Sequence, residues 1–378
     1  MSIWLPLPGN QQVFIDLFLH QDAFCARYNT IRRIRVYIVS SLCAMAPFHL
    51  LRLPSVALDE VLKTMCLLEL IQLASVSKKI QRFIKITLST VPIDMVVAMR
   101  QGNIILTLNA GATAQPLEFA IDCETSFGEL RDLQIDGIRM QVRVDTDASN
   151  ITNYMIHAAT LQRLLNHFGK MFKDLTVSVC DRDNDRDKWH YLTKFFEKYK
   201  PKIDDMSLYD NGAKTELTIY KQFLAASKTA RKIFIEAKSE PAFLYDPDEK
   251  LLVTNHVNVN ITPATWVTTE NIKIFGNCCS LILYETQFNS EDLNMILKDW
   301  MEAPASPLVV LSLEAAESID EDLVFKDLPV RAIEDEVVKG FMPREPTETR
   351  YRLGEHAAIF IDDKFLKFHN LSKMTNYN

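Results

Sequence analysis

The residues most suggestive of chemistry form the acidic run DRDNDRDKWHYL at positions 181–192. Four aspartates fall at alternate positions, as the oxygen ligands of a calcium loop do: Asp181, Asp183, Asp185 and Asp187. A calcium loop also needs a glycine at its sixth position and a bidentate glutamate at its twelfth, and here those positions hold Arg186 and Leu192. We therefore predict a solvated loop in which aspartates and arginines pair with one another, without bound calcium.

Histidine and cysteine do not recur at the spacing of a metal site. His157 and His167 are ten residues apart in one expected helix, with no cysteine at ligand spacing. The pair Cys278-Cys279 precedes an expected strand, so we interpret both residues as core rather than as nucleophiles. The sequence contains no G-x-S-x-G elbow, Walker loop or Rossmann fingerprint. We therefore expect no catalytic residue, no metal and no cofactor, and we do not interpret the chain as an enzyme.

The composition is that of a folded protein with a sizeable core. Of the 378 residues, 48% are hydrophobic and 24% are charged, which is ordinary for a soluble globular chain and allows two or three domains. The net charge of −7 argues against a general nucleic-acid binder, because neutralising phosphates needs a basic surface. The seven cysteines are odd in number and never spaced as CxxC, which predicts reduced thiols in a cytoplasmic or nuclear protein.

Residues 1–45 share no clear periodicity with the rest, and we treat them as an N-terminal extension of unknown role. Near their end, three arginines precede an apolar run at 36–46 that resembles the hydrophobic part of a signal peptide. The region before this run is too long for a signal peptide, and the run is too short to span a bilayer. We therefore expect no membrane association. The alternative hypothesis, a membrane-anchored or secreted enzyme, has only this segment to support it.

Three short helices are predicted next. Helical spacing begins at Ser55, and an apolar stripe follows at i, i+3, i+4 and i+7: Leu58, Val61, Leu62 and Met65. A second run, 68–76, is apolar nearly all round, and Ser77 stands where it would cap a third helix. Three helices in about 35 residues form a unit that is too small to be stable by itself.

After Pro92 the pattern changes from helix to strand. The segment 89–150 is rich in β-forming residues that partly alternate, as in NIILTLNA and IRMQVRVD. From 151 to 370 helices and strands alternate, and the tail predicts a β-hairpin that turns near Asp362-Asp363. Helices are predicted at four places: 153–171, 188–199, 217–228 and 290–302.

An apolar L-x-x-L-x-L pattern recurs along the expected strands. It occurs at Leu130/Leu133/Ile135, Phe172/Leu175/Val177, Ile203/Met206/Leu208, Ala230/Ile233/Ile235, Cys278/Leu281/Leu283 and Leu308/Leu311/Leu313. Several of these sites are about 30 residues apart, near the period of leucine-rich repeats, and Cys180 and Asn211 stand where such repeats place a turn residue. The uneven spacing, with one gap of 48 residues, also fits an ordinary α/β domain.

We favour an α/β fold in which the small three-helix domain is followed by a degenerate leucine-rich-repeat-like βα domain with a C-terminal hairpin. In such a fold parallel strands line one concave face, as in recognition scaffolds. The strands at 175–177, 206–208 and 281–283 are then expected to be neighbours in one parallel sheet.

The helical segment at 48–85 resembles an F-box. The F-box pattern has a Leu-Pro step, an Ile/Val-Leu pair, an acidic-Leu step, a Val-Ser-basic step and a basic-aromatic step. This sequence supplies them in order: Leu53-Pro54, Val61-Leu62, Glu69-Leu70, Val76-Ser77-Lys78 and Arg82-Phe83.

A second resemblance covers 272–315, which is similar to the type 2 F-box-associated domain of a family of F-box proteins expanded in nematodes. Its hallmarks match Cys278 to Leu283, Ser290 to Asn294, Leu297-Lys298-Asp299-Trp300 and Leu308 to Leu311. The resemblance implies an F-box at 46–88, a β-rich connecting segment at 89–150 and an F-box-associated βα domain at 151–370, with its best match at 262–330. Members of the family usually begin just before the F-box, which would make Met45 the natural start.

The resemblance implies an adaptor rather than a catalyst. The F-box would dock on a Skp-type adaptor, and through it on a cullin, while the C-terminal domain would bind a target protein for ubiquitination. The docking residues implied are Leu53, Pro54, Leu58, Val61, Leu62, Leu70, Leu73 and Val76. Two alternatives stay open: a helical bundle that packs only on its own C-terminal domain, and a protein-interaction scaffold that acts outside a ubiquitin ligase.

Overall fold

The computed structural model describes most of the chain from residue 53 onward. The described ranges are 2–7, 11–16, 53–65, 67–100, 102–110, 116–121, 129–135, 138–146, 152–156, 161–210, 215–240, 242–244, 257–275, 278–303, 306–332, 349–354 and 357–374, and before residue 17 and from 121 to 156 only the backbone is described. The chain divides into two units, residues 1–90 and 91–378. No helix in the described ranges is long and apolar enough to cross a membrane.

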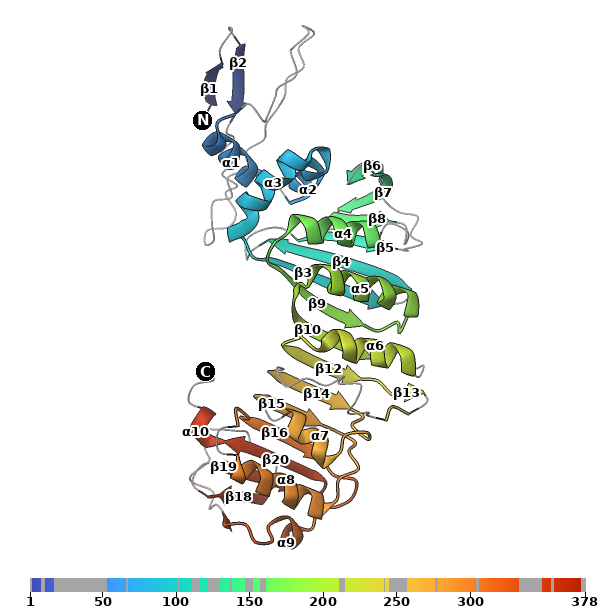
Figure 1. Cartoon of the computed structure of the whole chain (residues 1–378), viewed down its shortest axis with the longest axis vertical. Helices are drawn as coiled ribbons and strands as arrows, with labels where there is room; N and C mark the ends of the chain where they lie inside the picture. The colour runs from blue at the N-terminus through green and yellow to red at the C-terminus, as the bar shows by residue number, and fades with distance from the viewer. Residues whose placement is uncertain are drawn as a thin grey trace. The chain divides into compact units, whose positions relative to one another are not determined.

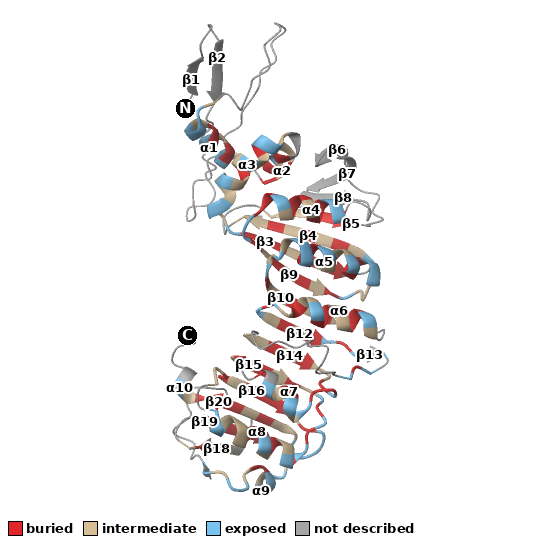
Figure 2. Cartoon of the chain, viewed as in Figure 1, coloured by how far each residue is buried: buried red, intermediate tan, exposed pale blue. Residues whose placement is uncertain are grey.

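Three short helices and a small apolar core characterise the first unit. The helices are α1 (Ser55–Thr64), α2 (Leu67–Val76) and α3 (Lys78–Thr87), followed by a 3-10 turn at Leu88–Thr90. Their buried apolar side chains are Leu58, Leu62, Leu67, Leu70, Ile71, Ala74, Ile80 and Ile84 (Figure 2). Ser77 caps α3 as predicted, because its hydroxyl accepts a hydrogen bond from Lys79 N at 3.2 Å. In the same unit β1 (Ser2–Leu7) pairs antiparallel with β2 (Gln11–Asp16).

The second unit is built on one large sheet. In the part of the chain that the structure describes, sixteen strands form it in the lateral order β17-β18-β19-β20-β16-β15-β14-β12-β10-β9-β3-β4-β5-β8-β7-β6 (Figure 1). In chain order these strands are β3 (Ile93–Arg100), β4 (Asn103–Ala110), β5 (Leu117–Ile121), β6 (Glu129–Ile135), β7 (Ile138–Thr146), β8 (Thr152–Ile156), β9 (Leu175–Asp181), β10 (Lys202–Tyr209), β12 (Lys232–Glu236), β14 (Asn258–Thr262), β15 (Ser280–Leu283), β16 (Val310–Glu314), β17 (Val330–Ala332), β18 (Thr349–Leu353), β19 (Ala357–Asp362) and β20 (Phe365–Asn370). A separate pair joins β11 (Thr215–Glu216) to β13 (Ser239–Glu240).

The strands β9, β10, β12, β14, β15 and β16 are all parallel and follow one another across the sheet in chain order. Parallel neighbours need a crossover connection, and in the described residues four of these connections carry a helix. The helices are α5 (Arg186–Tyr199), α6 (Leu217–Ser227), α7 (Thr269–Ile274) and α8 (Ser290–Glu302). Together with α4 (Leu161–Met171), they cover one face of the sheet (Figure 1).

Burial alternates along the parallel strands, so the two faces of the sheet differ. In β9, Leu175 and Val177 are buried, whereas Thr176 and Ser178 are partly exposed (Figure 2). Because successive side chains of a strand point to opposite faces, the buried series packs under the helices and the other series lies on the face away from them. We call that second face the open face.

The predicted parallel sheet is present, with one addition. β9 and β10 are direct neighbours, while β15 lies farther along the same parallel run, beyond β12 and β14. β14 fills the gap of 48 residues in the sequence pattern, and its Val259 and Ile261 are buried like the pattern residues of the other strands. The pattern passed over this strand because the polar residue His256 stands at its first position. The leucine-rich-repeat-like character of these units stays a prediction.

Three predictions for single segments are wrong. The helix expected at 153–171 is strand β8 followed by α4, because residues 152–156 pair with both β5 and β7. The pattern at 130–135 belongs to β6, an edge strand antiparallel to β7, and is therefore no parallel repeat unit. Cys180 lies inside β9 rather than in a turn, and Asn211 lies outside the described residues.

Antiparallel strands close the C-terminal side of the sheet. β20 pairs antiparallel with β16, and β19 and β20 form the predicted hairpin. Its turn is Asp363-Lys364, where Asp363 has a positive φ of 42° that short polar residues tolerate. Two short helices complete this end, α9 (Glu321–Val324) and α10 (Leu371–Met374).

A glycine on α4 sets how closely this helix approaches α5. A Cβ on Gly169 would lie 2.7 Å from ring atoms Cδ1 and Cδ2 of Tyr199, closer than carbon atoms pack. The tyrosine ring cannot move away freely, because its hydroxyl donates a 3.0 Å hydrogen bond to Asn166 Oδ1 on α4. We expect Gly169→Ala to lower the free energy of unfolding by roughly 1–3 kcal/mol despite the better helix propensity of alanine, as measured by urea unfolding.

A double-mutant cycle provides the control for this prediction. Tyr199→Ala removes the ring, so the effect of Gly169→Ala in that background should become neutral or stabilising. An equal loss of stability in both backgrounds would show that the helix contact is not the cause.

Candidate functional site

The predicted docking residues in the first unit differ in how accessible they are. Leu58, Leu62 and Leu70 are buried in the structure. Leu53, Val61 and Leu73 are half-buried, and Pro54 is exposed. The side chain of Val76 lies outside the described residues. The set is therefore divided between a core and a surface.

The three buried leucines hold the helices together. Leu58 and Leu62 lie one turn apart on α1, and Leu70 lies on α2. Leu58 and Leu70 are buried because a unit this small has to bury its stripe residues before it can offer any to a partner, and whether they contact an adaptor stays a prediction. In this chain their first role is to support the surface.

The docking residues inferred from the sequence do not include two exposed apolar residues. Val56 on α1 and Ile86 on α3 are 75% and 68% exposed. The Thr87 hydroxyl donates a 2.7 Å hydrogen bond to Asp59 Oδ1, which ties the start of α1 to the end of α3. Val56 lies one turn before Asp59 and Ile86 directly precedes Thr87, so both belong to the turns that this bond joins. Their exposure could have been predicted, because both residues lie outside the apolar stripes of their helices.

Asp59 is the polar centre of this surface. Lys63 Nζ lies 2.6 Å from its Oδ2 and 3.1 Å from Glu60 Oε1. Hydrogen bonds from Lys63 and Thr87 hold the pKa of the Asp59 carboxyl below its usual value. The carboxylate therefore stays charged while it joins the two helices.

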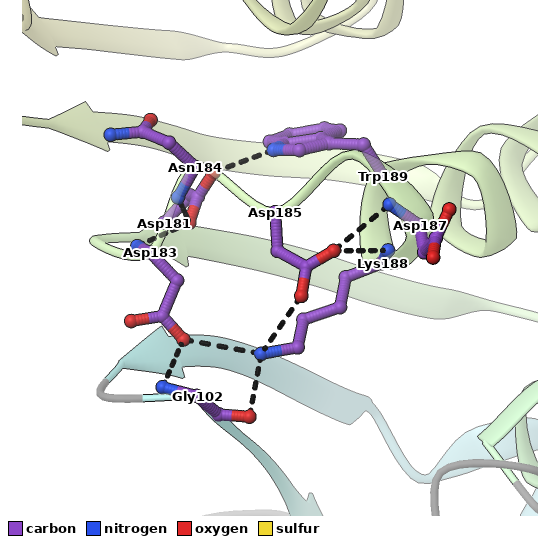
Figure 3. Close-up of polar contacts among 8 residues, drawn as sticks. All are labelled: Gly102, Asp181, Asp183, Asn184, Asp185, Asp187, Lys188 and Trp189. Atoms are coloured by element: carbon purple, nitrogen blue, oxygen red, sulfur yellow. Dashed lines mark hydrogen bonds and ion pairs between the residues drawn. The ribbon is translucent and has the colours of Figure 1, made fainter. Parts of the chain in front are cut away.

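The acidic run at 181–192 forms a polar cluster after β9 (Figure 3). Asp181 is fully buried, and its two oxygens accept hydrogen bonds from Trp189 Nε1 at 2.5 Å and from the backbone N–H groups of Asp183 and Asn184. Burial raises the pKa of Asp181, and these hydrogen bonds lower it in part. Asp185 caps α5 by accepting from the backbone N–H groups of Asp187 and Lys188.

Lys188 occupies the place where a cation would otherwise neutralise the aspartates. Its ammonium lies 3.2 Å from Asp183 Oδ2 and 3.6 Å from Asp185 Oδ2, and it donates to the carbonyl of Gly102 at 2.7 Å. Gly102 N donates in turn to Asp183, so the loop is fastened to the β3–β4 turn (Figure 3). The aspartates are paired, with Lys188 and backbone N–H groups in place of the predicted arginines. Asp181 and the side chain of Asp183 are buried, whereas Arg182, Arg186 and Asp187 are exposed.

The other candidate groups do not form a reactive centre. Among the described residues, no group of three or more histidine, cysteine or acidic side chains could hold a metal ion. Cys278 is buried, and burial raises the pKa of its thiol to about 12, which suits a core residue and not a nucleophile. His167 is buried in α4, and His157 lies outside the described residues.

The hallmark residues around α8 have structural roles: they cap this helix and bind the segment around α9. Asn289 and Asp292 form a reciprocal capping box at the start of the helix. Ser290 Oγ accepts a hydrogen bond from Asp320 N at 2.9 Å, and Asn294 Nδ2 donates to the carbonyls of Val324 and Lys326. These bonds fix α9 and the segment around it on α8.

The remaining hallmark residues pack α8 on the sheet. Leu293, Ile296 and Leu297 are buried, and the ring of Trp300 lies edge-on to Phe368 of β20, with centroids 4.3 Å apart. Leu281 and Leu283 of β15 and Leu311 of β16 are buried beneath the same helices. The hallmark residues therefore determine how α8 packs on the sheet and how α9 is fastened to α8.

Comparison with known families identifies both parts of this architecture. Residues 50–90 match the F-box domain, and residues 249–312 match the F-box-associated domain. The chain contains an F-box domain followed by an F-box-associated domain. No curated protein and no solved structure matches the chain.

The two matches fall on the two structural features just described. The F-box covers α1 to α3 with their divided core and surface, and the F-box-associated match covers the parallel strands β14 and β15 with α7 and α8. Such domains are typically adaptor modules: F-boxes generally bind Skp-type adaptors, and F-box-associated domains bind substrates.

Removing the buried ammonium of Lys188 should destabilise the second unit. Lys188→Ala leaves the carboxylate of Asp183 buried without its counterion, so we expect a loss of about 3–5 kcal/mol in the free energy of unfolding. Lys194→Ala, at an exposed position of the same helix, is the matched control and should change little. If both variants unfold alike in urea, the cluster does not fasten the loop.

Calcium should have no effect on the folded protein. The oxygens of Asp181, Asp183 and Asp185 already accept hydrogen bonds from Trp189, Lys188 or backbone N–H groups. We expect the same Tm in millimolar calcium and in a chelator. A rise in Tm that saturates with calcium would show that these groups rearrange around an ion.

Proposed function

We propose that this F-box protein is the target-recognition subunit of a Skp-cullin-F-box type ubiquitin ligase. The observation that carries the proposal is the presence in one chain of an F-box, in its own structural unit, and an F-box-associated domain in a second unit. Ubiquitin transfer depends on bringing the target close to the loaded enzyme, and a chain with two binding units supplies that proximity without an active site.

The surface of the F-box supports docking on a Skp-type adaptor. Val56 and Ile86 expose most of their side chains, and Leu53, Val61 and Leu73 are half-buried beside the core leucines. A helical unit of this size gains stability when a partner covers such residues. A stable interface would bury about 1,200–2,000 Å² in total, so the adaptor would cover more than these five side chains.

In the proposed complex the C-terminal unit holds the target protein. The open face of its parallel sheet presents partly exposed side chains on a framework that the helices fix from behind. Binding residues placed on a rigid sheet lose little freedom when a partner arrives, which favours recognition. The proposal includes a cytoplasmic or nuclear location, where Skp-type adaptors and cullins would be met.

Capture of a Skp-type adaptor tests the proposal. We expect the full chain to co-precipitate the adaptor, and Val56→Asp/Ile86→Asp to lose at least nine-tenths of it, because two carboxylates would be desolvated in an apolar interface. Circular dichroism and Tm should stay unchanged in this variant, since both side chains are already in water.

Two further variants separate docking from folding. Lys79→Asp places a carboxylate at the second residue of α3, as Val56→Asp does in α1, and should retain the adaptor if that part of α3 faces away. Leu62→Ala opens the core and should lose both the adaptor and stability, by about 2–5 kcal/mol. If the wild-type chain captures no adaptor, the protein acts as a scaffold outside a ligase and the proposal fails.

A further inference from the structure

A depression of about 500 Å³ lies on the open face where the parallel strands meet the C-terminal hairpin. It is lined by residues from the ends of β14, β15, β16 and β19 and from the start of β20, among them Tyr284, Glu285, Glu314, Asp362, Phe365 and Lys367. The strand register brings these residues together, because Phe365 pairs with Glu314 on one side and with Asp362 on the other. The site therefore depends on the change from parallel to antiparallel pairing.

Two aromatic rings and a fixed carboxylate shape the depression. The rings of Tyr284 and Phe365 meet edge to face, with centroids 6.2 Å apart and an interplanar angle of 77°. Glu314 Oε2 accepts a 2.9 Å hydrogen bond from the backbone N–H of Glu285, which orients the carboxylate without neutralising it. Aromatic faces next to a carboxylate are the surroundings that a guanidinium or ammonium group prefers.

The charges of the lining favour a cation. Glu285, Glu314 and Asp362 supply three carboxylates against the single ammonium of Lys367. Glu285 also pairs with Lys238 at 3.3 Å, but both side chains of that pair are about half exposed, so water screens it. An anionic ligand would meet a net repulsion here, whereas a cationic side chain would be attracted.

The open face next to the depression suits an extended peptide segment. Ile282 of β15 and Phe234 of β12 lie in one lateral row on either side of Asn260, and the ring of Tyr209 on β10 lies 5.1 Å from that of Phe234. Phe365, which pairs with Glu314, and Tyr209, which pairs with Glu236, lie in the adjacent row on the same face. From β20 to β10 the sheet crosses five strand-to-strand steps of about 4.8 Å each, or roughly 24 Å. A segment of about seven extended residues would span that distance.

We propose that the depression binds an arginine or lysine side chain of the target protein, within an extended segment whose apolar residues lie along Ile282, Phe234 and Tyr209. The inference rests on the proposed role of this unit in target binding and adds the chemistry of the target: a basic residue at one end of a short apolar segment. The site is selective for a basic side chain, because a ligand without a positive charge would bury the carboxylates without a counterion.

A phage-displayed library of random decapeptides, panned against the full chain, tests this inference. We expect enriched peptides to carry one basic residue next to alternating apolar residues, and a labelled peptide of that kind to bind less tightly as ionic strength rises. Glu314→Gln/Asp362→Asn should weaken its binding at least tenfold. Lys367→Gln removes the opposing charge and should strengthen binding a few-fold.

The controls keep the outcomes distinct. Asp174→Asn/Glu302→Gln removes two exposed carboxylates away from the depression and should leave peptide binding unchanged. Enrichment of peptides without a basic residue, no enrichment, or equal binding by the Glu314→Gln/Asp362→Asn variant would overturn the inference. Adaptor capture is measured on the same variants: its absence would refute the proposed ligase role, while the peptide result judges the depression by itself.

Discussion

The second unit depends on the lateral register of six parallel strands. Because side chains alternate between faces, this register sends Val177, Met206 and Leu281 under the helices and leaves the intervening residues on the open face. A shift of one residue in any strand would place polar side chains in the core and apolar ones in water. The helix-covered face and the open face are thus two consequences of one strand pairing.

The register also explains why the F-box-associated hallmark is recognisable from sequence. Its residues cap α8, fasten α9 and press Trp300 against Phe368, so each of them is tied to a particular contact. Residues with such fixed packing roles form a sequence pattern even where the surface is free to differ. The hallmark therefore reports the fold and carries no information on the side chains of the open face.

Sequence patterns correctly predicted the features that depend on local periodicity and helix capping. The cap at Ser77, the parallel strands and the turn near Asp363 are set by local rules, and the structure contains them. Strand β14 was missed because one polar residue interrupts its pattern. The segment at 152–156 was mistaken for helix because pairing with β5 and β7, which no local pattern reveals, decides its conformation.

The candidate sites show the same division between local and tertiary information. The F-box motif located the three helices, but a motif does not distinguish a leucine that supports a surface from one that forms it, and Leu58 and Leu70 prove to be buried. Val56 and Ile86 carried no motif. The depression at Glu314 joins residues from five strands spread over more than 100 positions, and only the three-dimensional pairing brings them together.

The two proposed interfaces differ in physical character, and this difference bears on how such an adaptor would work. The F-box surface exposes the apolar side chains of Val56 and Ile86 on a core too small to be stable alone, which favours a long-lived partner that completes the fold. The depression is polar and charged, on a sheet that is complete without a ligand. Charged contacts of that kind are weakened by salt and can be displaced by competing ligands. A recognition subunit needs this combination, because it stays with its ligase while successive targets bind and leave.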